Sequence, residues 1–371
     1  MNKAIGITLA VIVALVGLGF GGRAYATHAM NARAVTPKPL GTKTPAAAGL
    51  PFSRVAVEAG DRTLIGWWVR ARADSGRVPP AILFLHGNRS TISDYIDLQK
   101  LFYRQGISSM VFDYSGFGAS GGSPSLKNSV ADAGSVARVF EDSAGKAARK
   151  VALASGLGST VLLQSIDSVQ PHVSGIVIDG VDASVRASAV RSGRIPKLVA
   201  PLVVDVGDNV AAASRVRVPT LAIHSGSDAR VTLADVQQVT GAITSPSSVV
   251  EHWRKTKGGL LSSSRPCDWA PVLGFVRTGA LPKAKIDTTN ACEIEKQQAA
   301  IAAAQAAKDS AAKAAKGGTK GRTGTKTAAK QPATKTAAPA TKTKAPATKT
   351  TTKTPTTKAK APATKTPAKK P

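Results

Sequence analysis

Three residues have the side chains and the chain order of a nucleophilic hydrolase site. Ser155 carries a hydroxyl, Asp228 a carboxylate and His252 an imidazole, and His252 is the only histidine of five that follows Asp228. A serine attacks an ester carbonyl when an imidazole takes its proton, and a carboxylate orients that imidazole. One interpretation is therefore a serine esterase or lipase that uses Ser155 as nucleophile, Asp228 as acid and His252 as base.

Short apolar, β-branched runs must form the elements that position these residues. They lie at 81–85, 109–112, 151–154, 175–178 and 220–223, with helix-compatible segments between them. Continuous apolar strands that alternate with helices are typical of a parallel sheet covered on both faces. The sequence therefore predicts an α/β fold with a mostly parallel, doubly wound sheet.

Three spaced motifs identify a resemblance. The first predicted strand ends in His86-Gly87-Asn88, residues 113–125 read D-Y-S-G-F-G-A-S-G-G-S-P-S, and residues 219–228 read P-T-L-A-I-H-S-G-S-D. In this order they closely resemble the lipase/esterase-like branch of the α/β-hydrolase superfamily. The resemblance covers about residues 52–281. It implies an α/β-hydrolase fold, an oxyanion-binding amide near His86-Gly87-Asn88, and the triad acid at Asp228.

The residue expected to act as nucleophile departs from that family's pattern. The nucleophile sits on a tight strand-to-helix turn, G-x-S-x-G, whose flanking residues must be small. Here the frame with small flanks is Ala154-x-Gly156-x-Gly158, which puts a glycine at the nucleophile position. Ser155 is one residue early, and both Ser155 and Ser159 would have bulky residues at the flanks. Glycine tolerates such a turn but has no attacking atom.

The triad histidine is also missing where the resemblance implies it. The glycine-containing loop after the last predicted strand has Leu260 in the likely place of the histidine. His252 lies within that strand, some residues early. Asp228 therefore occupies the acid position without a clear partner, and we expect a degenerate, non-catalytic protein, a pseudoenzyme. The alternative remains a hydrolase with the shifted site Ser155-Asp228-His252.

A binding crevice can persist without the triad. Open α/β sheets bind ligands beyond the carboxyl ends of their strands. We expect His86, Gly87, Asn88 and Leu157 around such a pocket, with the amides of Asn88 and Leu157 holding an anion or a carbonyl oxygen. The expected ligand is a small acyl or carboxylate compound.

Cofactor and metal sites are not expected. Gly116-x-Gly118-x-x-Gly121 matches a dinucleotide fingerprint, but Pro124 follows and the helix that the fingerprint needs does not start at these glycines. Two cysteines at wide spacing and scattered histidines give no metal-ligand pattern.

The N-terminus predicts export. Lys3 precedes an uncharged apolar stretch at 4–22, and Ala24-Tyr25-Ala26 has the form of a signal-peptidase site. The stretch is also long enough to remain as a membrane anchor. The basic residues that follow the stretch are a counter-signal, because the positive-inside rule would place that side of an anchor in the cytoplasm. We expect a signal peptide or anchor at 1–26 and a protein of the cell envelope, periplasmic or otherwise extracytoplasmic, with anchoring in the inner membrane as one option.

The rest of the chain divides by composition. A Pro/Ala/Thr-rich linker is expected at 27–51, the hydrolase-like domain at 52–282, an Ala-rich helix at 290–316 and a disordered Lys/Thr/Ala/Pro tail at 317–371. Cys267 and Cys292 flank the end of the body. In an oxidising compartment they could form a disulfide that clips the helix to the domain.

Charge is concentrated in the tail. The chain has a net charge of +28, and the 62 residues from Ser310 onward hold 16 basic residues and no acidic one. Spaced lysines bind polyanions through salt-sensitive, sequence-independent contacts. The tail has no aromatic residue for base stacking. Expected partners are an anionic membrane or an envelope polymer; nucleic acid is possible without sequence specificity, and a solvated spacer is the alternative.

Overall fold

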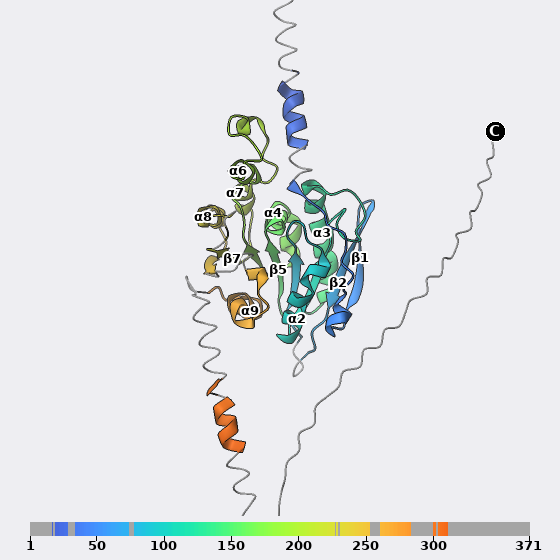
Figure 1. The fold of residues 1–371 in the computed structure, drawn as a ribbon, viewed down its shortest axis with the longest axis vertical. Coiled ribbons are helices and arrows are strands. Elements are labelled where there is room, and N and C mark those ends of the chain that lie inside the picture. The colour runs from blue at the N-terminus through green and yellow to red at the C-terminus, as the bar shows by residue number, and fades with distance from the viewer. Residues whose placement is uncertain are drawn as a thin grey trace, which may run out of the picture. The chain divides into compact units, whose positions relative to one another are not determined.

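A computed structural model of the 371-residue chain describes residues 17, 19–28, 34–73, 78–226, 228, 231–252, 260–282, 300–301 and 303–310. By its internal contacts the chain separates into Met1–Asp309 and Ser310–Pro371. The first unit contains the sheet domain (Figure 1). Of the second unit only Ser310 is described, so the predicted tail lies outside the described residues.

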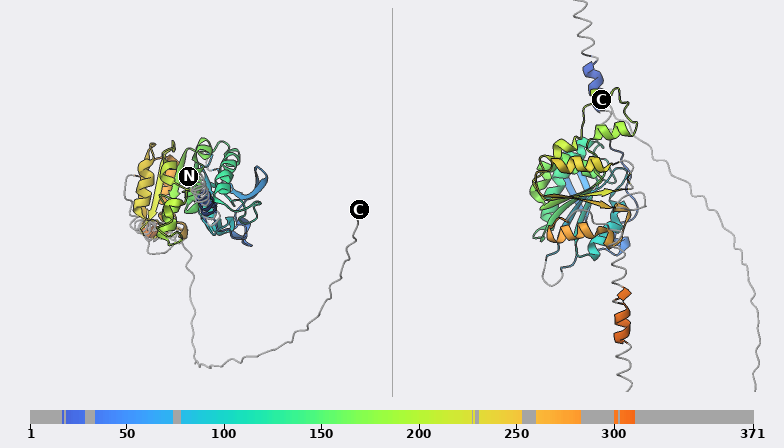
Figure 2. Two further views of the ribbon diagram at one scale, coloured as in Figure 1. Left: turned by 90° about the horizontal axis from the view of Figure 1, so that it is seen from above. Right: turned by 90° about the vertical axis from the view of Figure 1, so that its left-hand side faces the viewer.

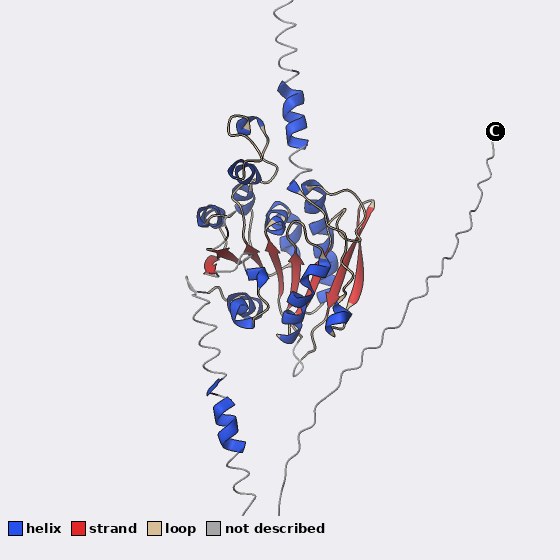
Figure 3. Cartoon of the chain, viewed as in Figure 1, coloured by secondary structure: helices blue, strands red, loops and turns tan. Residues whose placement is uncertain are grey.

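One eight-stranded sheet forms the centre of the domain (Figure 3). Its strands are β1 (Ser53–Ala59), β2 (Arg62–Val69), β3 (Ala81–Leu85), β4 (Ser108–Phe112), β5 (Lys150–Ser155), β6 (Gly175–Asp179), β7 (Thr220–Ser225) and β8 (Ser247–His252), in the order β1-β2-β4-β3-β5-β6-β7-β8. Strands β3 to β8 pair in parallel, and β1 and β2 pair antiparallel at one edge. The mostly parallel α/β fold that the sequence predicts is confirmed.

Helices cover both faces of the sheet (Figure 2). They are α2 (Ile96–Arg104), α3 (Leu126–Ala144), α4 (Leu157–Gln164), α5 (Ile166–Val169), α6 (Val185–Arg191), α7 (Asn209–Ala213), α8 (Leu233–Ala242) and α9 (Ala270–Thr278). Buried residues of α3, α4, α5, α7 and α8 belong to one hydrophobic cluster, and those of α2 and α9 to another. The sheet therefore separates two cores.

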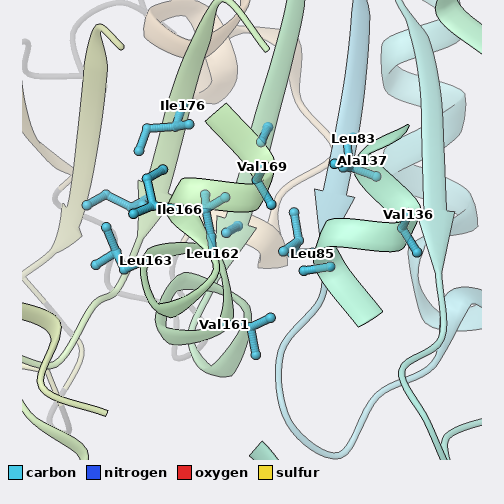
Figure 4. Close-up of a cluster of buried hydrophobic side chains, with 14 of the residues drawn as sticks. Leu83, Leu85, Val136, Ala137, Val161, Leu162, Leu163, Ile166, Val169 and Ile176 are labelled. Carbon is cyan, nitrogen blue, oxygen red and sulfur yellow. The ribbon is translucent and has the colours of Figure 1, made fainter. Parts of the chain in front are cut away.

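Strand alternation divides each strand between the two cores. Leu83 and Leu85 of β3 pack in the first cluster, together with residues of α3 and α4 such as Val136 and Val161 (Figure 4). Ile82 and Phe84 of the same strand pack in the second cluster. Because successive strand side chains point to opposite faces, continuous apolar runs fit a sheet buried on both sides.

The second half of the segment predicted as a linker lies against the domain. Val35 is buried, Pro39 forms a parallel bridge with Gly118, and Lys38 pairs with Asp94 at 2.7 Å. Composition predicts a linker here because proline, alanine and threonine form no periodic pattern. These contacts are made instead with loops that are distant in the sequence.

Two helical segments lie outside the sheet domain, at 19–28 and around 300–310. Most of the apolar stretch at 4–22 and the residues 290–299 and 311–316 of the predicted Ala-rich helix lie outside the described residues. Among the residues that are described, no helix has both the length and the apolar character needed to cross a membrane.

Candidate functional site

The turn from β5 to α4 is the centre of the candidate site. Gly156 follows β5 and caps α4, with φ 55° and ψ −114°. Its amide donates a 3.0 Å hydrogen bond to the carbonyl oxygen of Asp179, and the Ser159 hydroxyl donates to the same oxygen at 3.1 Å. The end of β6 therefore fixes the turn, and Ser159 has a structural partner.

The two glycines of this turn have different surroundings. A Cβ added to Gly156 would meet no other atom within 4 Å, so the space where a side chain would project is open. A Cβ added to Gly158 would lie 2.0 Å from the carbonyl oxygen of Leu85. Gly158 is therefore needed for close packing of α4 against the end of β3, whereas Gly156 is favoured by its positive φ.

Ser155 is directed toward a carboxyl group. It is the last residue of β5, it is half-buried, and it lies opposite Asp179 in the parallel register with β6. Its hydroxyl donates a 3.3 Å hydrogen bond to Oδ2 of Asp179. The Ser155 hydroxyl thus has a hydrogen-bond acceptor on the neighbouring strand.

Asp179 is a site residue that our sequence reasoning missed. Burial raises the pKa of its carboxyl from the ordinary 3.8 to about 7; the hydrogen bond from Ser155 lowers this pKa, and the negative charge of Asp228 raises it. A carboxyl whose pKa is strongly shifted marks a candidate functional group. The available signal was an aspartate that directly follows the apolar run at 175–178.

Asp228 lies beyond the carboxyl end of β7. Its amide donates a 2.9 Å hydrogen bond to the carbonyl oxygen of Ser225, and a Cβ added to Gly180 would be 3.9 Å from its Oδ2. Ser155, Asp179 and Asp228 are thus gathered at the carboxyl edge of the strands β5 to β7. Among the described residues, no group of three or more histidine, cysteine or acidic side chains is arranged to hold a metal ion.

His252 and Leu260 occupy the two positions considered for the triad histidine. His252 is the last residue of β8 and lies opposite Ser225; its side chain lies outside the described part of the chain. Leu260 begins a short 3₁₀ helix, Leu260–Ser262, and is 1% exposed within the second hydrophobic cluster. Its side chain contributes to the core there.

The His86 ring lies beneath the expected anion-binding loop. It is fully buried; its Nδ1 is 2.8 Å from the carbonyl oxygen of Gly87, and its Nε2 is 3.4 Å from Oδ1 of Asp113. The Tyr114 hydroxyl donates to the His86 carbonyl oxygen at 3.0 Å. These contacts fix the buried imidazole beside Gly87 and Asp113.

The Asn88 side chain connects the loop after β3 to the segment that begins at residue 34. Its amide oxygen accepts from the Thr36 amide at 2.7 Å, and its amide nitrogen donates to the Ala34 carbonyl oxygen at 2.9 Å. The backbone N–H groups of Asn88 and Leu157 have no protein acceptor among the described residues. Two unused donors therefore remain on the segments that flank the β5–α4 turn.

The glycine-rich loop at 113–125 makes contacts that stabilise the fold. Gly116 and Gly118 have φ values of 76° and 53°, and a Cβ on either would collide with Pro124 or with the Asp113 carboxylate. The Ser115 amide and hydroxyl donate to the buried Asp132 at 2.7 and 2.9 Å. These glycines therefore allow tight turns of this loop.

Cys267 is disulfide-bonded. The sequence has one other cysteine, Cys292, which lies outside the described residues.

Comparison with known families and structures supports this fold. A family profile described as "Serine aminopeptidase, S33" matches residues 77–202. An uncharacterized protein of Mycobacterium tuberculosis is 25% identical over 241 residues, covering 64% of this chain and 84% of the relative. An uncharacterized membrane protein of Saccharomyces cerevisiae is 27% identical over 145 residues, covering 38% of this chain and 50% of the relative.

Two solved structures share the fold at low identity. The esterase Pf2001 of Pyrococcus furiosus has a TM-score of 0.51 and 20% identity, covering 66% of this chain and 98% of the esterase. The acylaminoacyl peptidase of Pyrococcus horikoshii has a TM-score of 0.51 and 14% identity, covering 66% of this chain and 44% of the peptidase. The parallel sheet and the β5–α4 turn, together with these similarities, show that the chain has an α/β-hydrolase fold.

Proposed function

We propose that this protein is an α/β-hydrolase-like binding protein of the cell envelope that has no serine-triad catalysis. The observation that carries the proposal is Gly156 at the β5–α4 turn, with φ 55° and open space at its missing Cβ. Triad hydrolysis requires an attacking atom at the apex of this turn. Glycine keeps the conformation of the turn and supplies no such atom.

The remaining groups favour ligand binding. The free amides of Asn88 and Leu157 can donate to a carbonyl or carboxylate oxygen, as oxyanion donors do. With its pKa near 7, Asp179 carries a proton in a large fraction of molecules at neutral pH and can also donate. A small acyl or carboxylate compound is the ligand class whose oxygens would accept from such donors.

A serine esterase or lipase is the second candidate, and one observation favours it. Ser155 is hydrogen-bonded to Asp179, whose raised pKa makes it a possible proton acceptor near neutral pH. In that case Ser155 is the nucleophile, Asp228 the acid and His252 the base of a shifted site. The two candidates differ in whether Ser155 reacts with an electrophile.

A fluorophosphonate probe separates the two candidates. We expect no labelling of the purified full-length protein, and a thermal-shift screen of short-chain carboxylates and esters should show stabilisation that is lost when Asp179 is changed to leucine. Asp61→Leu is the matched control, because that side chain is 90% exposed. Labelling that disappears in Ser155→Ala would support the esterase.

The envelope location is proposed from three features. They are the apolar stretch at 4–22, the disulfide at Cys267 and the basic tail. Disulfides persist in oxidising compartments. A fusion of alkaline phosphatase to the C-terminus should be active in a bacterial host, and an inactive fusion with free thiols in the protein would contradict export.

We further propose that the tail binds anionic membrane or envelope polymer. Its 14 basic residues, counted over 317–371, contact phosphates or carboxylates without sequence preference. Retention on heparin should fall steeply as salt rises and should be lost when residues 317–371 are deleted. Retention that is independent of salt would contradict this role.

A further inference from the structure

Exposed apolar side chains gather on one segment of the sheet domain. In its described part, four large hydrophobic side chains are exposed: Val78 at 46%, Leu198 at 91%, Val199 at 39% and Val204 at 37%. Three of these four lie between α6 and α7. Figure 1 shows this segment beyond α6 and α7, and its Val204 lines a hollow together with Phe20 and Arg23 of the helix at 19–28.

The same segment is basic. The sequence has no acidic residue between Asp182 and Asp205 and has four basic ones. Two of them hold the base of the segment: Arg186 donates to the Val203 carbonyl oxygen at 3.0 Å, and Arg191 pairs with Asp182 and Asp235 at 2.9 Å.

The other two basic residues face solvent. Arg194 and Lys197 are exposed and flank the apolar residues Leu198 and Val199. Apolar side chains beside cations form an amphipathic surface that fits the boundary between acyl chains and anionic headgroups.

We propose that residues 194–204 are a docking segment for an anionic lipid bilayer. Charge complementarity favours this occupant. A second copy would bring the same Arg194 and Lys197 against each other across a symmetric interface, which like charges oppose. The pairing of Arg191 with Asp182 and Asp235 fixes the start of the segment, so the apolar tip is presented from an anchored base.

Docking would also orient the candidate site. Strand β6 ends at Asp179, and α6 begins at Val185, so the segment follows the carboxyl edge that holds the candidate site. A bilayer bound at residues 194–204 would then face this edge. This proposal does not depend on whether the site is catalytic.

A fluorescent probe tests the contact directly. The full-length chain with Leu198→Cys, labelled with an NBD dye without reductant, is mixed with vesicles of phosphatidylcholine alone or with phosphatidylglycerol. We expect a blue shift and brighter emission with the anionic vesicles. The matched control is Val78→Cys, an exposed valine that precedes the amino end of β3. The emission of a dye at this position should not shift.

The two labelled positions also separate the segment from the basic tail. The tail can bring the whole protein to vesicles, so co-sedimentation is measured in parallel. Protein that sediments while position 198 does not shift would overturn the proposal. A shift that appears without vesicles as protein concentration rises would indicate self-association and would overturn it too.

Charge reversal gives an independent readout. Arg194→Glu with Lys197→Glu should weaken partitioning to anionic vesicles by about tenfold or more. The control Arg104→Glu with Lys146→Glu makes the same change in net charge at exposed positions near the opposite edge. Equal loss in both double variants, with unchanged thermal melting, would contradict a dedicated docking segment.

Discussion

The Ser155 hydroxyl lies 3.3 Å from Oδ2 of Asp179, directly across the pair of strands β5 and β6. This contact joins the serine next to the nucleophile position to a buried carboxyl whose pKa lies near 7. It gives Ser155 a partner in the sheet, while the adjacent Gly156 occupies the turn itself.

The stability of the protein should depend on the titration of Asp179. Its folded pKa of about 7 is above the ordinary 3.8, so the folded state binds more protons than the unfolded state between these pH values. The free energy of unfolding should therefore fall as pH rises from about 4 to about 7, by at most about 1.4 kcal/mol per pH unit from this group. Urea unfolding at several pH values measures this slope.

Asp179→Asn is the variant that isolates this effect. It should flatten the slope between pH 4 and pH 7, whereas the exposed control Asp61→Asn should leave the slope as in the natural chain. A slope that Asp179→Asn does not change would show that the folded pKa is not raised.

The two glycines of the turn should respond differently to alanine. Gly156→Ala places a side chain in open space at φ 55°, so the cost should be that of backbone strain, about 1–3 kcal/mol. Gly158→Ala should cost more, because its Cβ would lie 2.0 Å from the Leu85 carbonyl oxygen. Chemical denaturation of both variants tests this order, and equal costs would contradict the packing of α4 on β3.

The disulfide at Cys267 should stabilise the protein. If Cys292 is the partner, the bond closes a loop of about 25 residues, and the chain-entropy estimate for such a loop is about 3.5 kcal/mol. Peptide mapping with and without reductant should show a linked pair of peptides that contain Cys267 and Cys292. Melting that reductant leaves unchanged would argue against this contribution.

Local patterns predicted the centre of the sheet well, because strands such as β3, β5 and β6 are buried on both faces. Val151, Ala152, Leu153 and Ala154 read as a buried strand, and each is buried. The small flanks Ala154 and Gly158 also placed Gly156 on the strand-to-helix turn. The need for small residues beside a tight turn involves only a few neighbouring positions, so it can be recognised in the sequence.

Contacts between distant segments were not predictable in this way. Asp179 becomes a site residue only because β5 and β6 are neighbours and Asp228 lies nearby. Val35 becomes buried only because the segment at 34–50 packs on loops that follow β3 and β4. The composition of these segments gives no indication of which distant residues they contact.

The most direct test of the central claim is fluorophosphonate labelling of the full-length protein and of Ser155→Ala, followed by mass spectrometry of the residues 150–165. We predict no adduct in either protein, because the turn carries Gly156, which has no attacking atom. An adduct on Ser155 that is absent from Ser155→Ala would contradict the account.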